Sequence, residues 1–482
     1  MATHRVAALA LASALAAAGC TTVGPDYRPV HPNAPSAWQA PRPHGGQTLE
    51  MLRWWARFDD PTVGKLVALA EADSPDLTVA WASIEKARAT LSSVRGGGVP
   101  ALTATADASR TRTAGQLLTS RSAEFDASWE IDLFGKIRRN AEASEARVVA
   151  RTADWHDTRV SLAAEVADTY VQWRACGLLA DTYERELKSN SQTELATLAS
   201  VRAGLTASAD EALASASLAS AQSSLLDQRA QCDVLVKALV YLTGRDEPAL
   251  RVLMTDSPVG IPAPAQLAVG SVPVDVLRQR PDLASLEREL AAASAEIGAA
   301  QAALYPSLSL SGAIGVSANG VSGLSASSGA PAIGWSFGPS ISLPIFDGGQ
   351  RRASVRSAEA AYLSAFASYQ QGVRRIVKEV EQALVNLGGA ASRTEQATTA
   401  ERQYRNYFLA TESNWRAGNV SLLTLEEARR LALTAEIQRI TLQRNRVQYW
   451  IALYKAAGGG WQPGQVVQAP ATPQVPPSGT DR

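Results

Sequence analysis

The chain has 482 residues, with 46 basic and 46 acidic side chains and a sequence pI near 6.9. This balance favours neither nucleic acid nor an anionic surface as a general partner. A mean hydropathy of −0.08 and an aromatic content of 6% are low for a chain that folds into several large cores. Composition therefore indicates an elongated molecule rather than a set of compact domains.

Residues 1–19 are typical of a secretory signal peptide, with a basic start, an apolar run and small residues at the end. The run is too short to span a bilayer, and no later stretch offers about 18 consecutive apolar residues. Residues 17–20 resemble a bacterial lipobox, so Cys20 is the predicted lipidated residue, carrying palmitate among its acyl chains. Thr21 beside it resembles lipoproteins sorted to the outer membrane. An ordinary signal peptide with a coincidental cysteine is the alternative.

The sequence also repeats itself. Pro-Asp-Leu at 75–77 recurs at 281–283, an offset of 206, and Arg-Ala-Gly at 202–204 recurs at 416–418, an offset of 214. Motifs that return in the same order at a slowly drifting offset indicate a tandem duplication. The predicted organisation is an extended Pro-rich arm at 20–60, a first repeat at 61–247, a linker at 248–266, a second repeat at 267–460 and a disordered tail at 461–482.

Each repeat is predicted to contain a helix, a β-hairpin, a long helix and a return helix. Apolar and polar residues alternate with period two in the hairpins, whereas apolar residues recur at coiled-coil-like steps in the helices. Each long helix would extend for roughly 100 Å, and Gly204 and Gly418 mark the turns into the return helices. The expected bounds are 99–132 and 307–346 for the hairpins, 136–203 and 350–417 for the long helices, and 209–242 and 422–456 for the return helices.

Four amphipathic strands cannot close a barrel, and an open sheet edge is not viable in lipid, so other copies must complete the sheet. Two chains would give a barrel of about eight strands, and side chains fill the interior of a barrel of that size. Three chains would give about twelve strands and leave a passage, which favours a trimer. The face expected to contact lipid carries the aromatic residues Phe125, Trp129, Trp335 and Phe337. The face expected to line the lumen carries the acidic residues Glu124, Asp126, Glu130 and Asp132. A soluble β-sandwich with one buried face is the alternative.

The two remaining cysteines are placed symmetrically about a predicted turn. Cys176 lies 28 residues before Gly204, and Cys232 lies 28 residues after it. On an antiparallel helical hairpin these positions face each other, and the periplasm permits oxidation. The spacing therefore predicts a Cys176–Cys232 disulfide, with two free core cysteines as the alternative.

No catalytic constellation emerges from the sequence. It contains no phosphate-binding loop and no HExxH zinc motif. Of the four histidines, His156 lies alone on a long helix, where a surface position is expected. The sequence therefore predicts no catalytic residue, no metal site and no cofactor, and the chain is not expected to be an enzyme.

Seven motifs follow one another in a fixed order along almost the whole mature chain. They are GPDYRPV (24–30), WEIDLFGKIRR (129–139), RPDL (280–283), AALYPSLSLSG (302–312), SLPIFDGGQRR (342–352), RAGNVSLLTLEEAR (416–429) and YKAAGGGW (454–461). In these motifs the chain resembles the TolC-type outer-membrane factors of the OprM/NodT lipoprotein branch.

The resemblance implies an α+β membrane channel, in which a homotrimer forms an outer-membrane β-barrel continued by a helical tunnel in the periplasm. It also implies the exit duct of a tripartite efflux pump that expels drugs or other toxic compounds. The implied partners are a periplasmic membrane-fusion adaptor, an inner-membrane pump of the RND type and outer-membrane lipid, and no nucleic acid. The expected location is the outer membrane, with a lipid anchor at Cys20.

The resemblance further implies a periplasmic gate, built from a leucine ring and an acidic ring and held by polar links. The matching positions are Leu423, Glu427 and Arg430, with glutamate where the family usually has aspartate. Ordinary coiled-coil positions are the alternative for these residues. A conduit for type I protein secretion would have the same fold. A periplasmic structural or adaptor lipoprotein would lack the four alternating segments.

Overall fold

The computed structural model describes residues 22–40, 54–55, 58–113, 116–255, 258, 260–262, 273–322, 332–465 and 467. The predicted signal peptide, Cys20 and most of the predicted tail lie outside these residues. The chain divides into two compact units that are described separately. The first unit comprises residues 1–31, 82–152 and 284–371, and the second comprises 32–81, 153–283 and 372–482.

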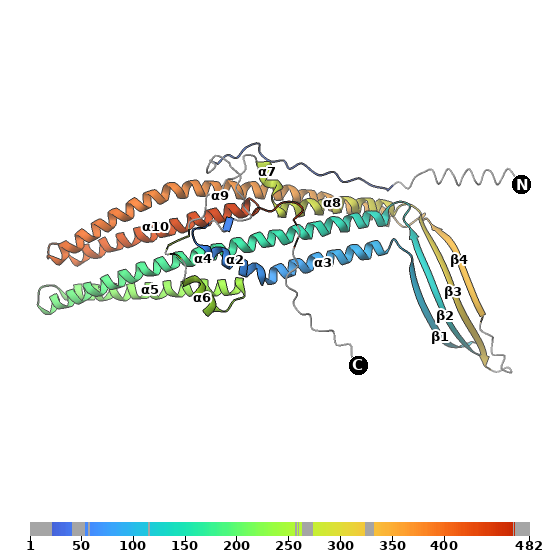
Figure 1. Ribbon diagram of the computed structural model, residues 1–482, viewed down its shortest axis with the longest axis horizontal. Coiled ribbons are helices and arrows are strands. Elements are labelled where there is room, and N and C mark those ends of the chain that lie inside the picture. The colour runs from blue at the N-terminus through green and yellow to red at the C-terminus, as the bar shows by residue number, and fades with distance from the viewer. Residues whose placement is uncertain are drawn as a thin grey trace. The chain divides into compact units, whose positions relative to one another are not determined.

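The two halves of the sequence have the same order of elements (Figure 1). The first half contains α2 (Pro61–Ala72), α3 (Pro75–Gly96), β1 (Ala101–Thr113), β2 (Gln116–Ile131), α4 (Lys136–Arg202) and α5 (Ser208–Thr243). The second contains α7 (Pro273–Arg278), α8 (Pro281–Ala302), β3 (Ser307–Ser322), β4 (Ala332–Ser342), α9 (Gln350–Arg416) and α10 (Leu422–Ala456). Each half thus opens with two helices where the sequence predicts one, because Pro75 and Pro281 each start a new helix.

The predicted linker at 248–266 is partly helical, since α6 (Glu247–Thr255) falls within it. Leu250 and Met254 are one helical turn apart and are both buried. Arg251 forms an ion pair at 2.6 Å with Asp233 of α5. Burial of one apolar face and this ion pair explain why the segment is ordered.

α4 and α9 each continue for 67 residues without a break. An aspartate carboxylate accepts from two backbone N–H groups at the start of each helix, where such groups lack partners within the helix. The carboxylate of Asp132 accepts from the backbone N–H of Ile137 and Arg138, at 3.1 and 2.9 Å. The carboxylate of Asp347 accepts from the backbone N–H groups of Gly349 and Arg351, at 2.9 and 3.2 Å.

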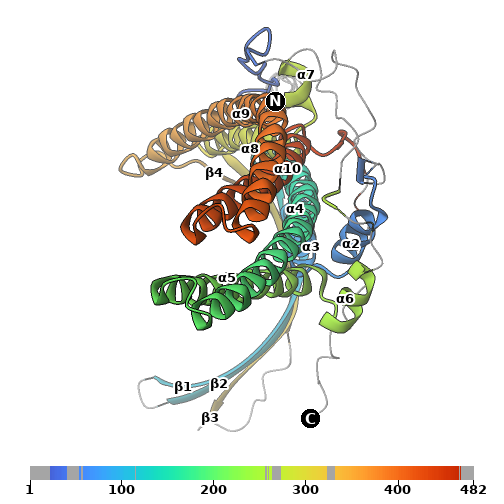
Figure 2. The same ribbon diagram turned by 90° about the vertical axis from the view of Figure 1, so that its left-hand side faces the viewer.

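The turns that follow α4 and α9 are left-handed, with φ of 71° at Gly204 and 76° at Gly418, which glycine adopts without strain. In the second unit, α5 then returns beside α4, and α10 returns beside α9 (Figure 2). The structure therefore has turns at Gly204 and Gly418, the two positions that the sequence predicts.

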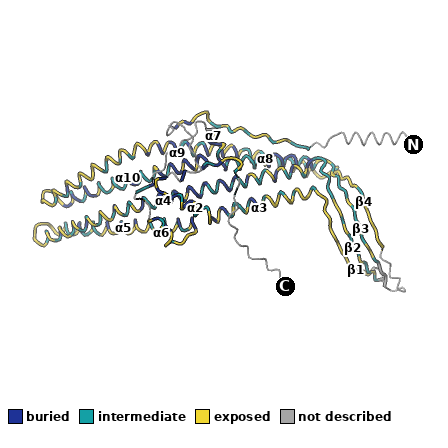
Figure 3. The backbone as a smooth tube through the Cα atoms, in the orientation of Figure 1, coloured by how far each residue is buried: buried dark blue, intermediate teal, exposed yellow. Residues whose placement is uncertain are grey.

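The strands form one antiparallel sheet in the order β1-β2-β3-β4. β2 and β3 join the two halves of the sequence through the pairing of Leu117–Ile131 with Leu308–Ser322. Among the described residues, no strand pairs with the outer edge of β1 or of β4. The described strand residues are exposed or half-buried, and none of them is buried (Figure 3). A single chain therefore presents an incomplete sheet.

The N-terminal arm is extended over residues 22–40 and is fixed to the helices in each unit. In the first unit, Arg139 donates to the carbonyls of Val23 and Gly24, both at 3.2 Å, and forms an ion pair with Asp26 at 2.8 Å. In the second unit, the carboxylate of Glu381 accepts from the backbone N–H groups of Gln39 and Ala40. These contacts hold a segment that has no regular secondary structure.

The second unit contains an aromatic core that the sequence did not predict. Trp54 stacks on Tyr454, with ring centroids 4.9 Å apart. Buried Asp60 accepts from the hydroxyl of Tyr170 at 2.5 Å and from Arg174 at 2.9 Å. The end of the predicted arm is therefore part of this core.

The prediction of a disordered tail is wrong for residues 461–465. Trp461 is buried, and the ring of His156 is also buried, with its Nε2 3.4 Å from the carbonyl oxygen of Gln465. His156 is thus a core residue rather than a surface one, and burial lowers its pKa. The remaining residues of the predicted tail, apart from Val467, lie outside the described chain.

Candidate functional site

The sheet of the first unit has one apolar face that is open to its surroundings. Register places Ala104, Phe125, Ile314 and Trp335 in one row across the four strands. The side chain of Trp335 is 78% exposed, that of Phe337 70% and that of Phe125 56%. Large aromatic side chains exposed on one face of a sheet are suited to contact with lipid.

Trp129 shares the face of these aromatics but lies near the end of β2, where it is half-buried. Its indole N–H donates to the carbonyl oxygen of Gly98 at 2.9 Å. This arrangement, with an apolar ring and a satisfied polar N–H, is typical of tryptophan at a membrane interface.

Three of the four predicted lumen residues share the opposite face of β2. Glu124, Asp126 and Glu130 are half-buried there and alternate with the apolar residues. Asp126 accepts from the hydroxyl of Thr105 at 3.5 Å, and Glu130 forms an ion pair with Lys136 at 3.5 Å. Asp132 follows the strand, and its carboxylate caps α4 instead.

Glu124 has room on this face because its neighbour across the sheet is a glycine. Gly315 of β3 pairs with Glu124, and Gly334 of β4 continues the row. A Cβ atom at Gly315 would come within 3.0 Å of the Cβ of Glu124. The row therefore keeps space for an acidic side chain on the polar face.

The residues predicted to form a gate lie together on α10. Leu423, Glu427 and Arg430 are all exposed, and their spacing of four and three residues places them on one face of the helix. The opposite face buries Leu422 and Leu425 against Ala214 of α5, with Phe408 and Trp415 of α9 packed beside them. One face thus anchors α10, while the other is free in the single chain.

Arg429, next to Arg430, is a site residue that the sequence analysis missed. It is buried and donates to Asn190 and Thr193 of α4 and to Glu426 of its own helix. Its guanidinium carbon also lies 5.7 Å from the ring centre of Phe408. The position follows Leu422 and Leu425 at helical spacing, and this periodicity could have revealed it.

Glu186 of α4 lies near this arginine and has a perturbed titration. Its pKa is raised to about 7, chiefly by burial; the positive charge of Arg429 opposes this shift, and the negative charge of Glu426 adds to it. Glu186 is therefore the group in this cluster whose charge changes near neutral pH.

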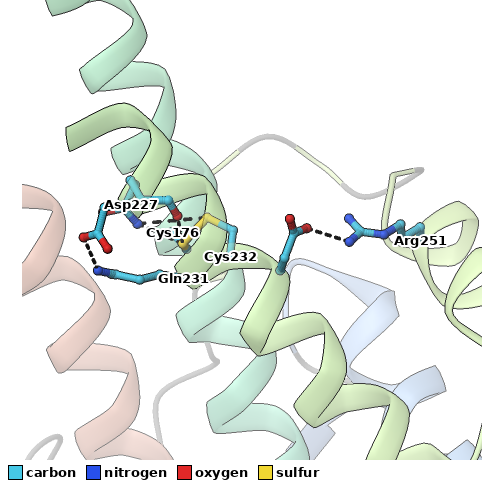
Figure 4. Close-up of a disulfide and its surroundings, with 7 residues drawn as sticks. Cys176, Asp227, Gln231, Cys232 and Arg251 are labelled. Carbon is cyan, nitrogen blue, oxygen red and sulfur yellow. Dashed lines mark hydrogen bonds and ion pairs between the residues drawn. A yellow bond between two sulfur atoms is a disulfide. The ribbon is translucent and has the colours of Figure 1, made fainter. Parts of the chain in front are cut away.

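Cys176 of α4 and Cys232 of α5 form a disulfide, with their Cα atoms 5.6 Å apart (Figure 4). This is the pairing that the spacing around Gly204 predicts. The amide of Gln228, one turn before Cys232, donates to the sulfur of Cys176 at 2.8 Å. The bond links the two helices of this antiparallel pair.

Arg280 of the RPDL motif joins three elements of the second unit. It is buried and bonds to Asp282 at 2.7 Å, to Glu379 of α9 at 3.1 Å and to the carbonyl oxygen of Lys455 at 3.0 Å. Its positive charge contributes to a lowered pKa of Asp282, which burial opposes. The motif therefore has a structural role, at the side of an open groove of about 460 Å³.

In the part of the chain that the structure describes, no helix is long and apolar enough to cross a membrane. No group of three or more His, Cys, Asp or Glu side chains among the same residues is placed to hold a metal ion.

A sheet with an open apolar face, together with long helices paired by glycine turns, defines the class of outer-membrane channels. The comparisons with known proteins agree. The model of the family described as outer membrane efflux protein matches residues 66–245 and again residues 272–459. The chain belongs to this family, and its location is the outer membrane.

Two curated relatives and one solved structure indicate how close the similarity is. The solvent efflux pump outer membrane protein SrpC of Pseudomonas putida is 30% identical over 465 residues, 93% of this chain and 97% of that protein. Outer membrane protein OprJ of Pseudomonas aeruginosa is 31% identical over 476 residues, which are 95% of this chain and 96% of that protein. The outer-membrane channel OprN is 33% identical with a TM-score of 0.80, covering 92% of this chain and all of that one.

Proposed function

We propose that this chain is the outer-membrane exit duct of a tripartite efflux pump and releases drugs, solvents or other small toxic compounds outside the cell. Three copies close their sheets into one barrel, and the paired helices form the tunnel that leads to it. The observation that carries this function is the sheet itself, which over the described residues has one apolar face, one polar face and two unpaired edges. In lipid, only a closed barrel satisfies those edges.

The partners are a periplasmic membrane-fusion adaptor and an inner-membrane pump of the RND type. The similarity to SrpC, which is named for solvent efflux, supports this partnership and the class of compound. The chain serves as a passage and performs no catalysis. A strain that lacks its own outer-membrane component tests the assignment, because expression of this chain should restore resistance to toluene and to hydrophobic antibiotics. Unrestored resistance despite outer-membrane insertion and a matched adaptor and pump would contradict it.

The anchor of the mature chain is Cys20, which carries several acyl chains because one alone gives only reversible membrane binding. Labelling with radioactive palmitate tests this proposal. Wild-type protein should incorporate the label, and the Cys20→Ala variant should not. Equal labelling of both proteins would place the modification elsewhere.

Leu423, Glu427 and Arg430 form the periplasmic gate of this duct. In a trimer, three copies of Leu423 give an apolar constriction that resists wetting, and three copies of Glu427 give an acidic ring that favours cations. The exposure of Leu423, at 67%, supports a role toward other copies or the lumen rather than in the core of one chain.

Single-channel recording tests the gate. The combined Leu423→Ala and Glu427→Ala substitutions should raise the conductance several-fold. Leu195→Ala and Glu395→Gln are matched controls, since Leu195 is 65% exposed on α4 and Glu395 is exposed on α9. A double variant with the conductance of the wild type would show that the gate lies elsewhere.

A further inference from the structure

Three arginines lie on the apolar face of the sheet, where charge is unexpected. Arg110 and Arg112 of β1 share the face of Ala104 and Ala108, because successive side chains of a strand alternate. Arg121 of β2 pairs with Ala108 and shares that face too. All three side chains are exposed. The side with the aromatic residues therefore also carries a basic cluster.

The cluster lies at one end of this face. β1 leaves α3 at Ala101, so Arg110 and Arg112 are near the turn to β2, at the end of the sheet away from α3 (Figure 1). Arg110 pairs with Thr119, which places it diagonally beside Arg121. A lipid-facing arginine is costly at the middle of a bilayer and nearly neutral at its surface. The arginines therefore mark the level at which the apolar band ends and the headgroups begin.

These arginines have no partner of opposite charge within the described residues. None of the ion pairs of the structure includes them, and the acidic residues Glu124 and Asp126 of β2 are on the other face of the sheet. Three neighbouring positive charges without an anion repel one another. An anion from outside the chain would relieve this repulsion.

We propose that Arg110, Arg112 and Arg121 bind the phosphate groups of lipids in the outer leaflet of the outer membrane. The proposal rests on the proposed function, because that function places this end of the sheet at the cell exterior. The planar guanidinium binds phosphate oxygens with two parallel hydrogen bonds, so arginine suits such a site better than lysine. Each chain of the trimer carries one site.

The surface next to the arginines favours a membrane lipid over free phosphate. Ala106 and Ala108 of β1 and Ala123 of β2 continue the same face directly below the cluster. Their small side chains leave a flat apolar surface against which acyl chains can lie. A charged end joined to an apolar surface matches an amphiphile, whereas free phosphate would use only the charged end.

The test measures binding of bis-phosphorylated lipid A to the purified full-length trimer in detergent. The variant Arg110→Gln/Arg112→Gln/Arg121→Gln should bind about 100-fold more weakly, and Arg110→Gln alone about fivefold more weakly. The matched control is Arg374→Gln/Arg393→Gln/Arg402→Gln, three exposed arginines of α9, and should bind like the wild type. Inorganic phosphate and dephosphorylated lipid A should compete poorly.

Undiminished affinity in both the triple and the single variant would overturn the proposal, as would equal competition by inorganic phosphate. If the triple variant does not assemble, the lipid affinity of the single variant Arg110→Gln decides the test. Planar-bilayer recording separates this inference from the proposed function. Wild-type protein that forms no channel would overturn the function, whereas wild-type channels with undiminished lipid affinity in the variants would overturn only the lipid site.

Discussion

Arg429 of α10 donates from Nη2 to the hydroxyl of Thr193 on α4, at 2.7 Å. Its Nη1 donates to Asn190 of α4 and to Glu426 of its own helix. The arginine therefore fastens the first turns of α10 to α4, in the second unit. Because Leu423 and Glu427 lie on those same turns, Arg429 positions the proposed gate without lining it.

Replacement of this arginine should loosen the start of α10. Arg429→Met keeps an apolar stem beside Phe408 but leaves the half-buried carboxylate of Glu426 without its partner. The loss of one member of a buried ion pair lowers the local opening free energy by about 3 kcal/mol. Amide hydrogen exchange over residues 422–432 should then be about 100-fold faster.

The adjacent Arg430→Gln is the control for Arg429→Met. Arg430 is exposed, so its substitution should change local stability by less than about 0.5 kcal/mol. Similar exchange rates in the two variants would show that Arg429 does not hold the helix.

Glu186 should make the stability of this region depend on pH. Its pKa is raised from 4.5 to about 7, chiefly by burial, so the folded chain favours the protonated form. The stability that this group contributes is fully present below pH 4.5 and is lost as the pH rises through about 7. The melting temperature of the wild type should therefore fall between pH 5 and pH 8 by more than that of Glu186→Gln, which cannot ionise. Parallel pH profiles of the two proteins would contradict this role.

The disulfide should stabilise the α4–α5 pair. Cys176 and Cys232 are 56 residues apart in sequence, and a bond that closes a loop of this size contributes about 2–4 kcal/mol. The Cys176→Ser/Cys232→Ser variant should melt at a lower temperature than the wild type. Reduction of the wild type should reproduce the change, and the variant should not respond to reductant. A variant as stable as the oxidised wild type would show that packing alone holds the helices.

The two faces of β2 should tolerate charge differently. Phe125 and Asp126 are adjacent in sequence and lie on opposite faces of the sheet. Phe125→Arg should destabilise the folded barrel by about 2–4 kcal/mol, because the arginine would face the apolar part of the bilayer. Asp126→Arg is the matched control and should leave assembly intact, since Asp126 is on the polar face, which is the proposed lining of the lumen. Urea titration of the protein in lipid vesicles compares the two, and equal destabilisation would contradict the assignment of the faces.

The strands and long helices were predictable because their patterns are local and long. Ala123, Phe125 and Ala127 alternate with polar residues, and this periodicity alone determines which side chains share a face. Asp132 shows where such a pattern becomes ambiguous. The alternation extends to this residue, but an acidic residue shortly before a helix is also a capping signal, and in the structure the cap prevails.

Contacts between distant segments were not predictable in the same way. The burial of Trp461 depends on His156, about 300 residues earlier, and no local pattern links the two. Arg139 is buried because the N-terminal arm crosses it, while the equivalent Arg352 of the second repeat has no such cover and is exposed. Two copies of a repeated motif therefore differ where a non-repeated segment covers only one of them.

Single-channel recording of the purified wild-type protein in a salt gradient directly tests whether the chain forms a channel with an acidic lumen. Current steps of one size are expected, with a reversal potential that reports cation selectivity, because Glu124, Asp126 and Glu130 are the proposed lining of the lumen. Glu124→Gln/Asp126→Asn should move that potential toward zero. Assembled trimers that insert into the bilayer but conduct no current would contradict the channel function, and trimers that prefer anions would contradict the acidic lumen.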